Sequence, residues 1–355
     1  MLNELTLSAT SWALKNIGRE WIDYFASNTM NVGTKRLAPF FWTYDCQAKI
    51  VNVRHETHDT ITLELLPNQH FAQAKAGQYI ELTVTIEGQK YSRCYSLSHI
   101  STETVAVTIK RKEGGLVSNW LYQQAKRGMV LTISHPQGNF IYQGQKQVLL
   151  MSAGSGITPC YSLMQYLKSN VQAIDIAMIA QFKTQEDIIF TEALTASQPA
   201  CKVHLPLSRS SHQPETAMTV LEQHPELLER DIYLCGPAGF MDKIVDYLVA
   251  KNYDLTRLQV ERFSFDSQQE LAEQCLSEIY FQSHNTTVTM NEADKGKTLL
   301  EIAEAHGIEL EHGCRVGMCG SCKCRLIQGE VTGNKLGVAV YPCTAYPASV
   351  KVVIA

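Results

Sequence analysis

The chain of 355 residues contains no run of 18 apolar residues, which excludes a membrane-spanning helix. It begins MLNELTLSATSW, with an early Glu4 and no basic region ahead of an apolar segment, so no secretory signal is expected. Lysine and arginine form no basic stripe, which argues against a nucleic-acid partner. We find no internal repeats. These absences predict a cytoplasmic protein without a transmembrane segment.

Positive charge is missing from residues 264–283, and the four acids of this segment account for the net charge of −4: Asp266, Glu270, Glu273 and Glu278. With 45% apolar and 19% charged residues, the composition is that of a globular protein with room for two or three domains. The eleven cysteines, an odd number, suit a reducing compartment better than a disulfide framework.

Four cysteines follow the pattern Cys-x4-Cys-x2-Cys with a distant fourth member: Cys314, Cys319, Cys322 and Cys343. This is the ligand spacing of a plant-type 2Fe-2S cluster. The interspersed glycines Gly313, Gly317 and Gly320 suit a loop that wraps closely around a cluster. A structural zinc site usually offers two separated Cys-x2-Cys pairs, so the pattern favours iron-sulfur over zinc. Cys324 is a fifth candidate, which the predicted strand KCRLIQGEV would aim into the core.

The hydrophobic pattern divides the chain into units. Short β-rich runs with turn residues between them predict a small antiparallel barrel, and alternating strands and helices then predict a parallel α/β sheet. A last compact α+β unit carries the cysteine loop. The expected limits are an N-terminal helical extension over 1–42, the barrel over 43–145, the α/β domain over 146–265, an acidic linker over 266–284 and the last domain over 285–355.

A helix through SWALKNIGREWIDYFAS in the N-terminal extension would place four apolar residues on one face, with Trp12 nearby: Leu14, Ile17, Trp21 and Phe25. We favour packing of this face on the protein's own barrel over docking to a membrane surface or a partner.

Two motifs in the barrel suit a flavin. Arg93-Cys94-Tyr95-Ser96 lies between two predicted strands, and an arginine can pair with phosphate, a tyrosine can pack on the isoalloxazine ring and a serine can reach flavin N5. By itself, such a motif in a strand is more often a set of surface residues without a binding role. In GGLVSNW, Ser118 and the backbone NH groups at a predicted helix start form a phosphate site, whereas Trp120 is expected in the core.

Two glycine turns follow predicted strands of the α/β domain. Gly154-Ser155-Gly156-Ile157-Thr158-Pro159 opens a helix, although it lacks the third glycine of the dinucleotide fingerprint. Cys235-Gly236-Pro237-Ala238-Gly239-Phe240 repeats the arrangement after a later strand. Two such turns at the carboxyl edge of one parallel sheet define a crevice, which is where these sheets bind ligands.

In this order, the motifs RCYS, GGLVSNW, GSGITP, CGPAGFM and ERF resemble the ferredoxin-NADP reductase superfamily, and the cysteine loop resembles plant-type ferredoxins. The resemblance covers about residues 47–355. Its layout is similar to that of the reductase components of phenylacetyl-CoA epoxidase and of fatty-acid desaturases. It implies a flavin-binding barrel, an NAD(P)H-binding α/β domain and a β-grasp ferredoxin domain.

The resemblance assigns roles to residues that match the motifs. It implies that Arg93, Tyr95 and Ser96 bind the flavin, with Ser96 near N5, and that Gly115 and Ser118 hold its pyrophosphate. We choose FAD because FMN has no pyrophosphate. The NAD(P)H turn would be lined by Gly154, Gly156, Thr158 and Pro159.

The resemblance also implies catalytic roles for Ser96, for Cys235 beside the nicotinamide and for Glu261 near the flavin. Gly236 and Pro237, which follow Cys235, are implied to bind the cofactor. A buried cysteine is usually only part of the core, so Cys235 has an ordinary alternative. Ser208-Arg209 occupies the position of a 2′-phosphate clamp, which favours NADPH over NADH.

The expected function is transfer of electrons from NADPH through FAD to a 2Fe-2S cluster and on to an oxygenase or a membrane fatty-acid desaturase. Peripheral contact with a membrane stays open. Only 20 residues separate Cys322 from Cys343, fewer than ferredoxins usually have, so a loop near the cluster is shortened. The alternatives are a stand-alone NAD(P)H diaphorase or redox sensor with a regulatory cluster domain, and a non-catalytic 2Fe-2S module, which would need no nicotinamide crevice.

Overall fold

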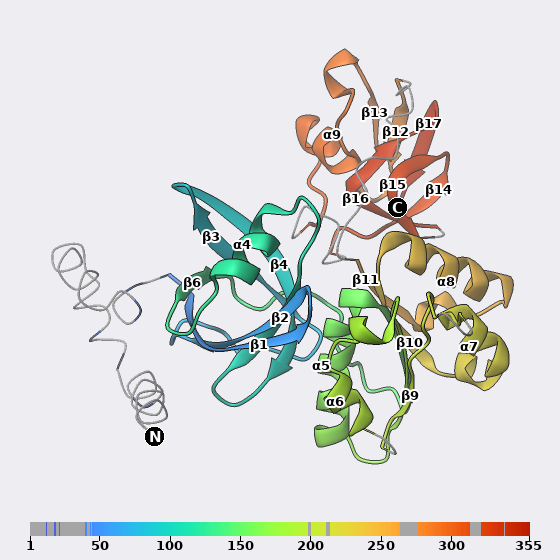
Figure 1. The fold of residues 1–355 in the computed structure, drawn as a ribbon. Helices are drawn as coiled ribbons and strands as arrows, with labels where there is room; N and C mark the ends of the chain where they lie inside the picture. Colours follow the sequence, from blue (N-terminus) through green and yellow to red (C-terminus); the bar gives the residue numbers. More distant parts are fainter. Residues whose placement is uncertain are drawn as a thin grey trace.

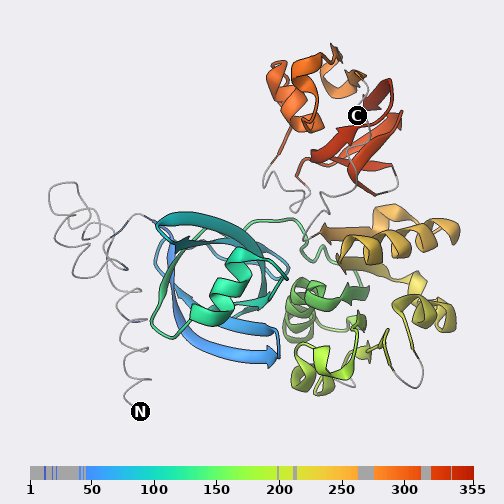
Figure 2. The same ribbon diagram turned by 45° about the horizontal axis from the view of Figure 1, so that its top comes forward.

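The computed structural model describes residues 45–197, 200–210, 214–262, 276–312, 321–336 and 338–355, together with Trp12, Gly18, Trp21, Phe40 and Thr43. Within these residues, three sheets follow one another along the chain (Figure 1). The view in Figure 2 shows the barrel beside the α/β domain, with the C-terminal domain above them. The multidomain fold expected from the sequence is confirmed.

The first sheet is a closed antiparallel barrel in the order β1-β2-β5-β4-β3-β6. Its elements are β1 (Gln47–Thr57), β2 (Thr60–Pro67), β3 (Tyr79–Ile86), β4 (Gln89–Ile100), β5 (Val105–Lys110), helix α4 (Leu116–Gln124) and β6 (Val130–Ile133). Alternate residues such as Ile61, Leu63 and Leu65 are fully buried inside it, and the half-buried Trp120 packs against the same core, as expected.

The placement of the RCYS motif between two strands was wrong. The motif lies inside β4, because antiparallel pairing with β3 continues through it from Leu82↔Arg93 to Tyr79↔Ser96. The polar residues interrupt the hydrophobic pattern of the strand without interrupting its backbone hydrogen bonds. Ser96 therefore sits on a rigid sheet.

The second sheet is entirely parallel, in the order β11-β10-β7-β8-β9. Its strands are β7 (Gln147–Ala153), β8 (Asp175–Gln181), β9 (Lys202–His204), β10 (Asp231–Gly236) and β11 (Leu258–Arg262). Its helices are η1 (Gly154–Gly156), α5 (Ile157–Asn170), η2 (Gln185–Asp187), α6 (Thr191–Thr195), α7 (Ala217–Gln223), η3 (Pro225–Glu229), α8 (Ala238–Ala250) and η4 (Leu255–Arg257). The chain builds outward from β7 to β9 and then returns to place β10 on the other side of β7. This topological switch point is where parallel sheets bind ligands.

The third sheet has the order β13-β12-β17-β14-β16-β15. Its elements are β12 (Glu278–Phe281), η5 (Gln282–His284), β13 (Thr286–Thr289), η6 (Glu292–Asp294), α9 (Leu299–Ala305), β14 (Cys324–Gln328), β15 (Val331–Leu336), β16 (Ala339–Pro347) and β17 (Lys351–Ile354). The sheet begins earlier than the predicted linker limit at residue 284, because β12 pairs with both β13 and β17. Ile279 and Phe281 are fully buried, and the acids around them obscured this alternation in the sequence.

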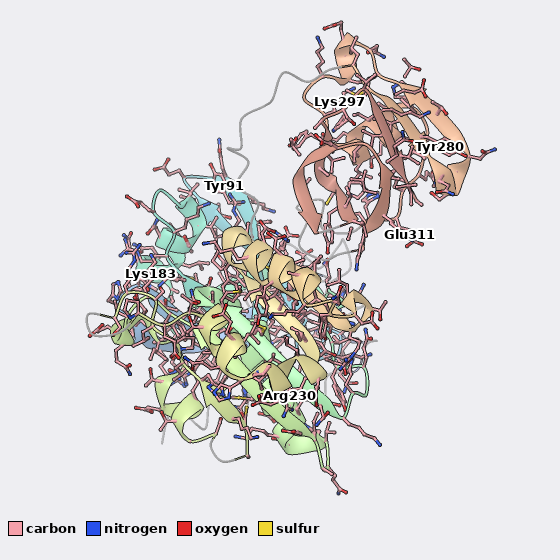
Figure 3. All side chains as sticks on the ribbon, turned by 90° about the vertical axis from the view of Figure 1, so that its right-hand side faces the viewer. Tyr91, Lys183, Arg230, Tyr280, Lys297 and Glu311 are labelled. Carbon is pink, nitrogen blue, oxygen red and sulfur yellow. The ribbon has the colours of Figure 1, made fainter. Side chains whose placement is uncertain are left out.

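The core of the C-terminal domain is continuous with that of the α/β domain. One cluster of buried side chains runs from Leu234 and Met241 to Val340 and Tyr341. Figure 3 shows the two domains from the side, with Lys183 and Arg230 marking the α/β domain and Tyr280, Lys297 and Glu311 the C-terminal one.

Most of the predicted N-terminal helix, including Leu14, Ile17 and Phe25, lies outside the described residues. Two of its tryptophans are described and are largely exposed, Trp12 at 68% and Trp21 at 56%. Among the described residues, no helix has the length and apolar character needed to cross a membrane.

Candidate functional site

A cavity of about 520 Å³ lies where the barrel meets the start of α5. Its walls come from β4, β5, the turn before α4 and the first residues after β7. Six residues proposed from the sequence line it: Arg93, Tyr95, Ser96, Gly115, Ser118 and Thr158. The structure thus gathers, around one cavity, motifs that are separated by up to 65 positions, from 93 to 158. Burial raises the pKa of Tyr95, which keeps its hydroxyl neutral.

The turn before α4 forms a cradle that fits a phosphate. Gly114 has a φ of +67°, and a Cβ added at Gly115 would lie 2.8 Å from Ser118 Oγ and 3.0 Å from the Lys112 carbonyl oxygen. No side chain caps the helix, so its first NH groups point toward the cradle without a capping partner. Backbone donors at a helix N-terminus suit an anion. These residues fit the pyrophosphate of FAD.

The cavity also has basic side chains that the motifs did not include. Lys110 and Lys112 line it beside Arg93, with Glu113 as the one acid of the lining, and Asp59 outside the lining pairs with Lys110 at 2.7 Å. Lys110 and Thr108 occupy outward positions of β5, alternating with inward core residues, and Lys112 continues the alternation just after the strand. The period-2 pattern of TVAVTIKRK could have identified all three side chains. An excess of positive charge suits a diphosphate.

Ser96 and Glu261 join the barrel to the α/β domain. The Ser96 hydroxyl donates a hydrogen bond of 2.8 Å to Glu261 Oε1, across 165 positions of sequence. Ser96 is 3% exposed and Glu261 2% exposed. Two side chains that the sequence assigned to one active site therefore meet in the structure, at the boundary between the two domains.

The two glycine turns of the α/β domain lie against each other. A Cβ added at Gly156 would come within 2.4 Å of the Cys235 carbonyl oxygen and 2.6 Å of Gly236 Cα. At Gly236 an added Cβ would approach Phe240 to 2.8 Å. Only glycines allow this contact at the switch point. Thr158 closes the first turn by donating to the Ser155 carbonyl at 3.0 Å, and Pro159 lies in the first turn of α5.

Two of the four proposed cluster ligands are described. Cys322 Sγ and Cys343 Sγ lie 3.2 Å apart, and both residues are buried. A disulfide would hold the sulfurs at about 2.0 Å, whereas a tetrahedral metal with bonds of about 2.3 Å holds them about 3.8 Å apart. Cys314 and Cys319 lie outside the described residues. The described pair is too widely spaced for a disulfide and close enough that both thiolates would hold the same cluster. Cys324 lies half-buried against the core, as the strand pattern predicted.

Three family models match the chain. They are the oxidoreductase FAD-binding domain over residues 47–142, the oxidoreductase NAD-binding domain over 150–246 and the 2Fe-2S iron-sulfur cluster binding domain over 281–348. The ferredoxin reductase component of 3-ketosteroid-9-alpha-monooxygenase from Mycobacterium tuberculosis is 30% identical over 274 residues, which is 72% of this chain and 75% of the relative. The chain belongs to the ferredoxin-NADP reductase superfamily.

Two further comparisons cover nearly the whole reductase. An NADPH oxidoreductase from Mycobacterium tuberculosis is 28% identical over 317 residues, which is 86% of this chain and 82% of the relative. The structure of phthalate dioxygenase reductase superimposes with a TM-score of 0.57 at 20% identity, covering 88% of this chain and 98% of that one. The latter shows the fold alone. The protein is therefore an NAD(P)H oxidoreductase of the electron-transfer type, with FAD, NAD and 2Fe-2S domains.

Cys235 of the reductase lies at the end of β10, where its pairing partners are Glu261 on β11 and Ser152 on β7. It is fully buried, and its pKa is well above the usual value because of burial and, next, because of the negative charge of Glu261. The same causes raise the pKa of Cys160. Both thiols therefore stay neutral.

Ser208 and Arg209 do not line the cavity of about 520 Å³. They follow β9, where the Ser208 hydroxyl donates to the Phe182 carbonyl at 3.2 Å and the Arg209 NH donates to the Lys183 carbonyl at 2.9 Å. These bonds fix the loop beside the carboxyl end of β8, on the ligand-binding edge of the sheet. The Arg209 side chain is exposed there.

The strand that carries Cys343 lies close to the strand that carries Glu261. Tyr341, two residues before Cys343, has a pKa raised to about 12 by burial, and the nearby guanidinium of Arg262 opposes this shift. Arg262 is itself held by Asp242 at 2.6 Å. The strand that carries Cys343 therefore lies near Arg262, which follows Glu261 in β11.

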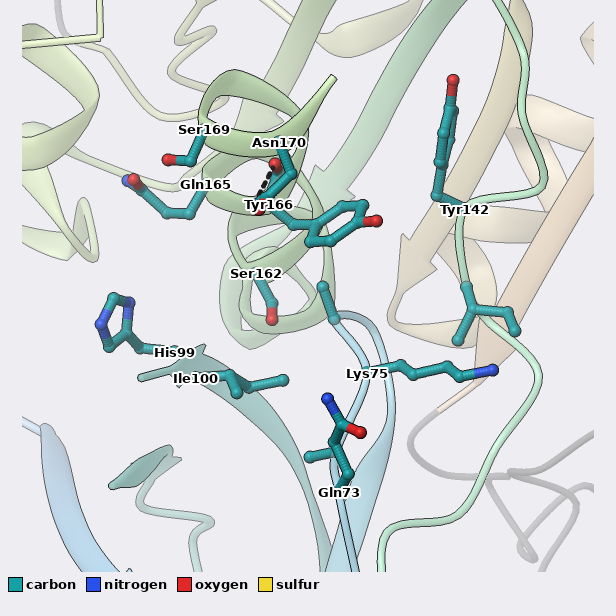
Figure 4. A pocket seen from close by; sticks show the side chains of 13 residues that line it. Gln73, Lys75, His99, Ile100, Tyr142, Ser162, Gln165, Tyr166, Ser169 and Asn170 are labelled. Carbon is teal, nitrogen blue, oxygen red and sulfur yellow. Dashed lines mark hydrogen bonds between the residues drawn. The ribbon is translucent and has the colours of Figure 1, made fainter. Parts of the chain in front are cut away.

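A second cavity of about 540 Å³ lies between the barrel and the far part of α5 (Figure 4). Lys75, His99, Tyr142 and Tyr166 are among its lining residues. None of the residues proposed from the sequence lines it. It shares no lining residue with the cavity of about 520 Å³, so the two cavities are separate.

Proposed function

We propose that this reductase takes electrons from NADPH and delivers them, through FAD and its cluster, to an oxygenase, with diiron fatty-acid desaturases as one class of acceptor. The observation that carries the proposal is the buried hydrogen bond between Ser96 and Glu261. It links Ser96, which lines the 520 Å³ cavity, to Glu261 on β11 of the parallel sheet. The names of the relatives, a monooxygenase reductase component and an NADPH oxidoreductase, support the acceptor class and the donor.

When bound, the cofactors supply hydride transfer, division of an electron pair into single electrons and one-electron storage. The protein supplies position and charge. Arg93 and the Gly115–Ser118 turn would hold the phosphates, Ser96 would lie on the flavin side with its hydroxyl bonded to Glu261, and neutral Cys235 would lie on the nicotinamide side. Burial of Ser96 and Glu261 excludes water from the reacting face.

We propose that Ser208 and Arg209 bind the 2′-phosphate of NADPH. Arg209→Ala is expected to raise the KM for NADPH about tenfold, because a charge-assisted pair is lost, and to change the KM for NADH little. Lys202→Ala, on exposed β9, is the matched control for removing a positive charge. Equal KM changes for both nucleotides in Arg209→Ala would reject the clamp.

The acceptor is tested by reconstitution. The holoenzyme is mixed with NADPH and either a Rieske oxygenase or a diiron desaturase in vesicles, and product formation is measured against NADPH oxidation. Coupled product formation with one of them supports the proposal. Oxidation of NADPH with ferricyanide, but with neither oxygenase, would instead indicate a diaphorase.

We also propose domain limits of 1–42, 43–145, 146–265 and, because β12 belongs to the third sheet, about 278–355 with the linker before it.

A cytoplasmic location is proposed on the cysteine content: none of the eight described cysteines forms a disulfide.

A further inference from the structure

A chain of buried hydroxyl groups leads from the flavin cavity across the outer face of the barrel. Thr108 lines the cavity, and its Oγ1 lies 2.9 Å from Ser98 Oγ and 2.8 Å from Thr62 Oγ1. Thr62 in turn donates to Glu56 Oε1 at 2.7 Å. Thr62, Thr108 and Ser98 are 6%, 5% and 1% exposed.

The far end of the chain reaches solvent. The Nε of Arg54 donates to Glu56 Oε1 at 2.8 Å, and the Arg54 side chain is 60% exposed whereas that of Glu56 is only 7% exposed. Thr62 and Ser98 also line a small cavity of about 290 Å³. The charged or titratable groups that face this cavity are Arg54, Glu64, His99 and Tyr161. The chain therefore spans the distance between the flavin cavity and a polar, charged rim.

The hydrogen-bonded chain has fewer protons than contacts, which allows it to conduct a proton. Four contacts join Glu56 to Thr62, Thr62 to Thr108, Thr108 to Ser98, and Ser98 to the Ala106 carbonyl at 3.3 Å. Each contact uses one proton, and a hydroxyl supplies one. The three hydroxyl groups supply three protons for the four contacts. With Glu56 ionised, one contact therefore has no proton. Rotation of the hydroxyl groups can move this proton-free contact along the chain. A carboxyl proton on Glu56 completes the set.

The reaction requires such a path. Oxidation of one NADPH gives NADP⁺, two electrons and one proton: the C–H bond of the nicotinamide breaks, the electrons leave one at a time through the cluster to the acceptor, and the hydrogen leaves as a proton. That proton has to pass to solvent from the inner part of the cavity, where Ser96 and Thr108 are only 3% and 5% exposed. We propose that it leaves through Thr108 and Thr62 to Glu56. This inference rests on the proposed function, because it requires the flavin to occupy the cavity that Thr108 lines.

The test uses Thr62→Val in the flavin-loaded protein. Valine has nearly the shape of threonine, and Thr62 does not line the flavin cavity, so flavin contacts are kept. The matched control is Thr83→Val, which removes a hydroxyl paired with Ser92 Oγ at 2.8 Å on the same barrel but off the chain. Thr62→Ser restores the hydroxyl. Should Thr62→Val fail to fold, Glu56→Gln keeps an acceptor oxygen while it removes the terminal proton site.

Two rates are measured. The first is proton release, followed with a pH indicator in stopped flow during a single turnover with ferricyanide. The second needs no turnover: exchange of the Thr108 hydroxyl proton with solvent, by NMR of the resting protein. Thr62→Val is expected to slow both at least about tenfold, as for loss of a proton-transfer group, whereas Thr83→Val and Thr62→Ser stay close to wild type.

Equal proton release and equal hydroxyl exchange in Thr62→Val and Thr83→Val would overturn the proposal and direct attention to another exit, such as one through Ser96 and Glu261. Failure of the proposed function has a different signature. In that case the unmodified protein would bind no flavin, which is measured by flavin fluorescence before any variant is compared.

Discussion

At the residue scale, the central feature is a serine and a glutamate held together in a buried interface. Isolated burial of a carboxyl group is costly, so Glu261 needs partners, and the Ser96 hydroxyl is one of them. Glu261 on β11 pairs in register with Cys235 on β10, so both residues lie at the same edge of the sheet. The arrangement keeps a hydrogen-bonded serine and glutamate beside a neutral thiol, at the carboxyl edge of the parallel sheet.

Ser96→Ala should therefore slow flavin reduction by NADPH about 100-fold, because the hydroxyl that orients the reacting face is lost. Stopped-flow flavin absorbance measures this rate. Ser92→Ala is the matched control, since Ser92 lies on the same strand, loses a hydroxyl bond to Thr83 and does not line the cavity. An unaltered rate in Ser96→Ala would remove Ser96 from the reacting site.

The roles of single residues were predictable to different degrees. Ser96, Gly115 and Thr158 were found because their motifs are local in sequence. Lys112 was missed, since it differs from ordinary surface lysines only in its position just beyond β5. The close approach of Gly156 to Cys235 depends on two strands brought together by the crossover, which spacing alone does not reveal.

At the element scale, strands were easier to predict than their interruptions. The limits of β1 and β2 coincide with the hydrophobic runs, because one face of each strand is buried in the barrel. The segment TQEDIIFTEALTA, residues 184–196, is divided into η2 and α6, since Phe190 adopts a left-handed φ of 65° and stacks on Tyr161 at 4.1 Å between ring centroids. Such tertiary contacts override local preference.

The junction of η6 and α9 contributes stability that depends on pH. The hydrogen bond from His306 is the main cause of a pKa of about 2 for Asp294, below the ordinary value of 3.8. Because the folded pKa is lowered, the stabilisation is fully present above about pH 4 and is lost as the pH falls toward 2. Asp294→Asn should unfold at lower temperature than wild type at pH 6, with a smaller difference at pH 3.

Circular dichroism of the full chain measures these unfolding midpoints. Glu292→Gln is the control, because Glu292 lies in the same turn but is exposed and pairs only with Lys295 on the surface. A difference between wild type and Asp294→Asn that stays constant from pH 6 to pH 3 would assign the effect to something other than the ionised carboxyl.

At the scale of the whole molecule, three domains that bind separate cofactors share two junctions. Ser96 and Glu261 join the barrel to the α/β domain, and Arg262 lies close to Tyr341 of the ferredoxin domain. Because Glu261 and Arg262 are consecutive, one strand, β11, contacts both neighbours. The order of domains followed from the motifs, but this shared strand could not be predicted, since nothing in the sequence relates β11 to β16.

In this reductase, electrons are expected to pass from the flavin to the cluster within one chain. The most direct test of this transfer compares Cys343→Ser with Cys324→Ser, a nearby thiol outside the ligand set, in holoenzyme reduced anaerobically with one equivalent of NADPH. Cys343→Ser should keep ferricyanide reduction and lose cytochrome c reduction by about tenfold or more, while Cys324→Ser retains both. Cytochrome c reduction that persists in Cys343→Ser at the level of Cys324→Ser would contradict transfer through the cluster.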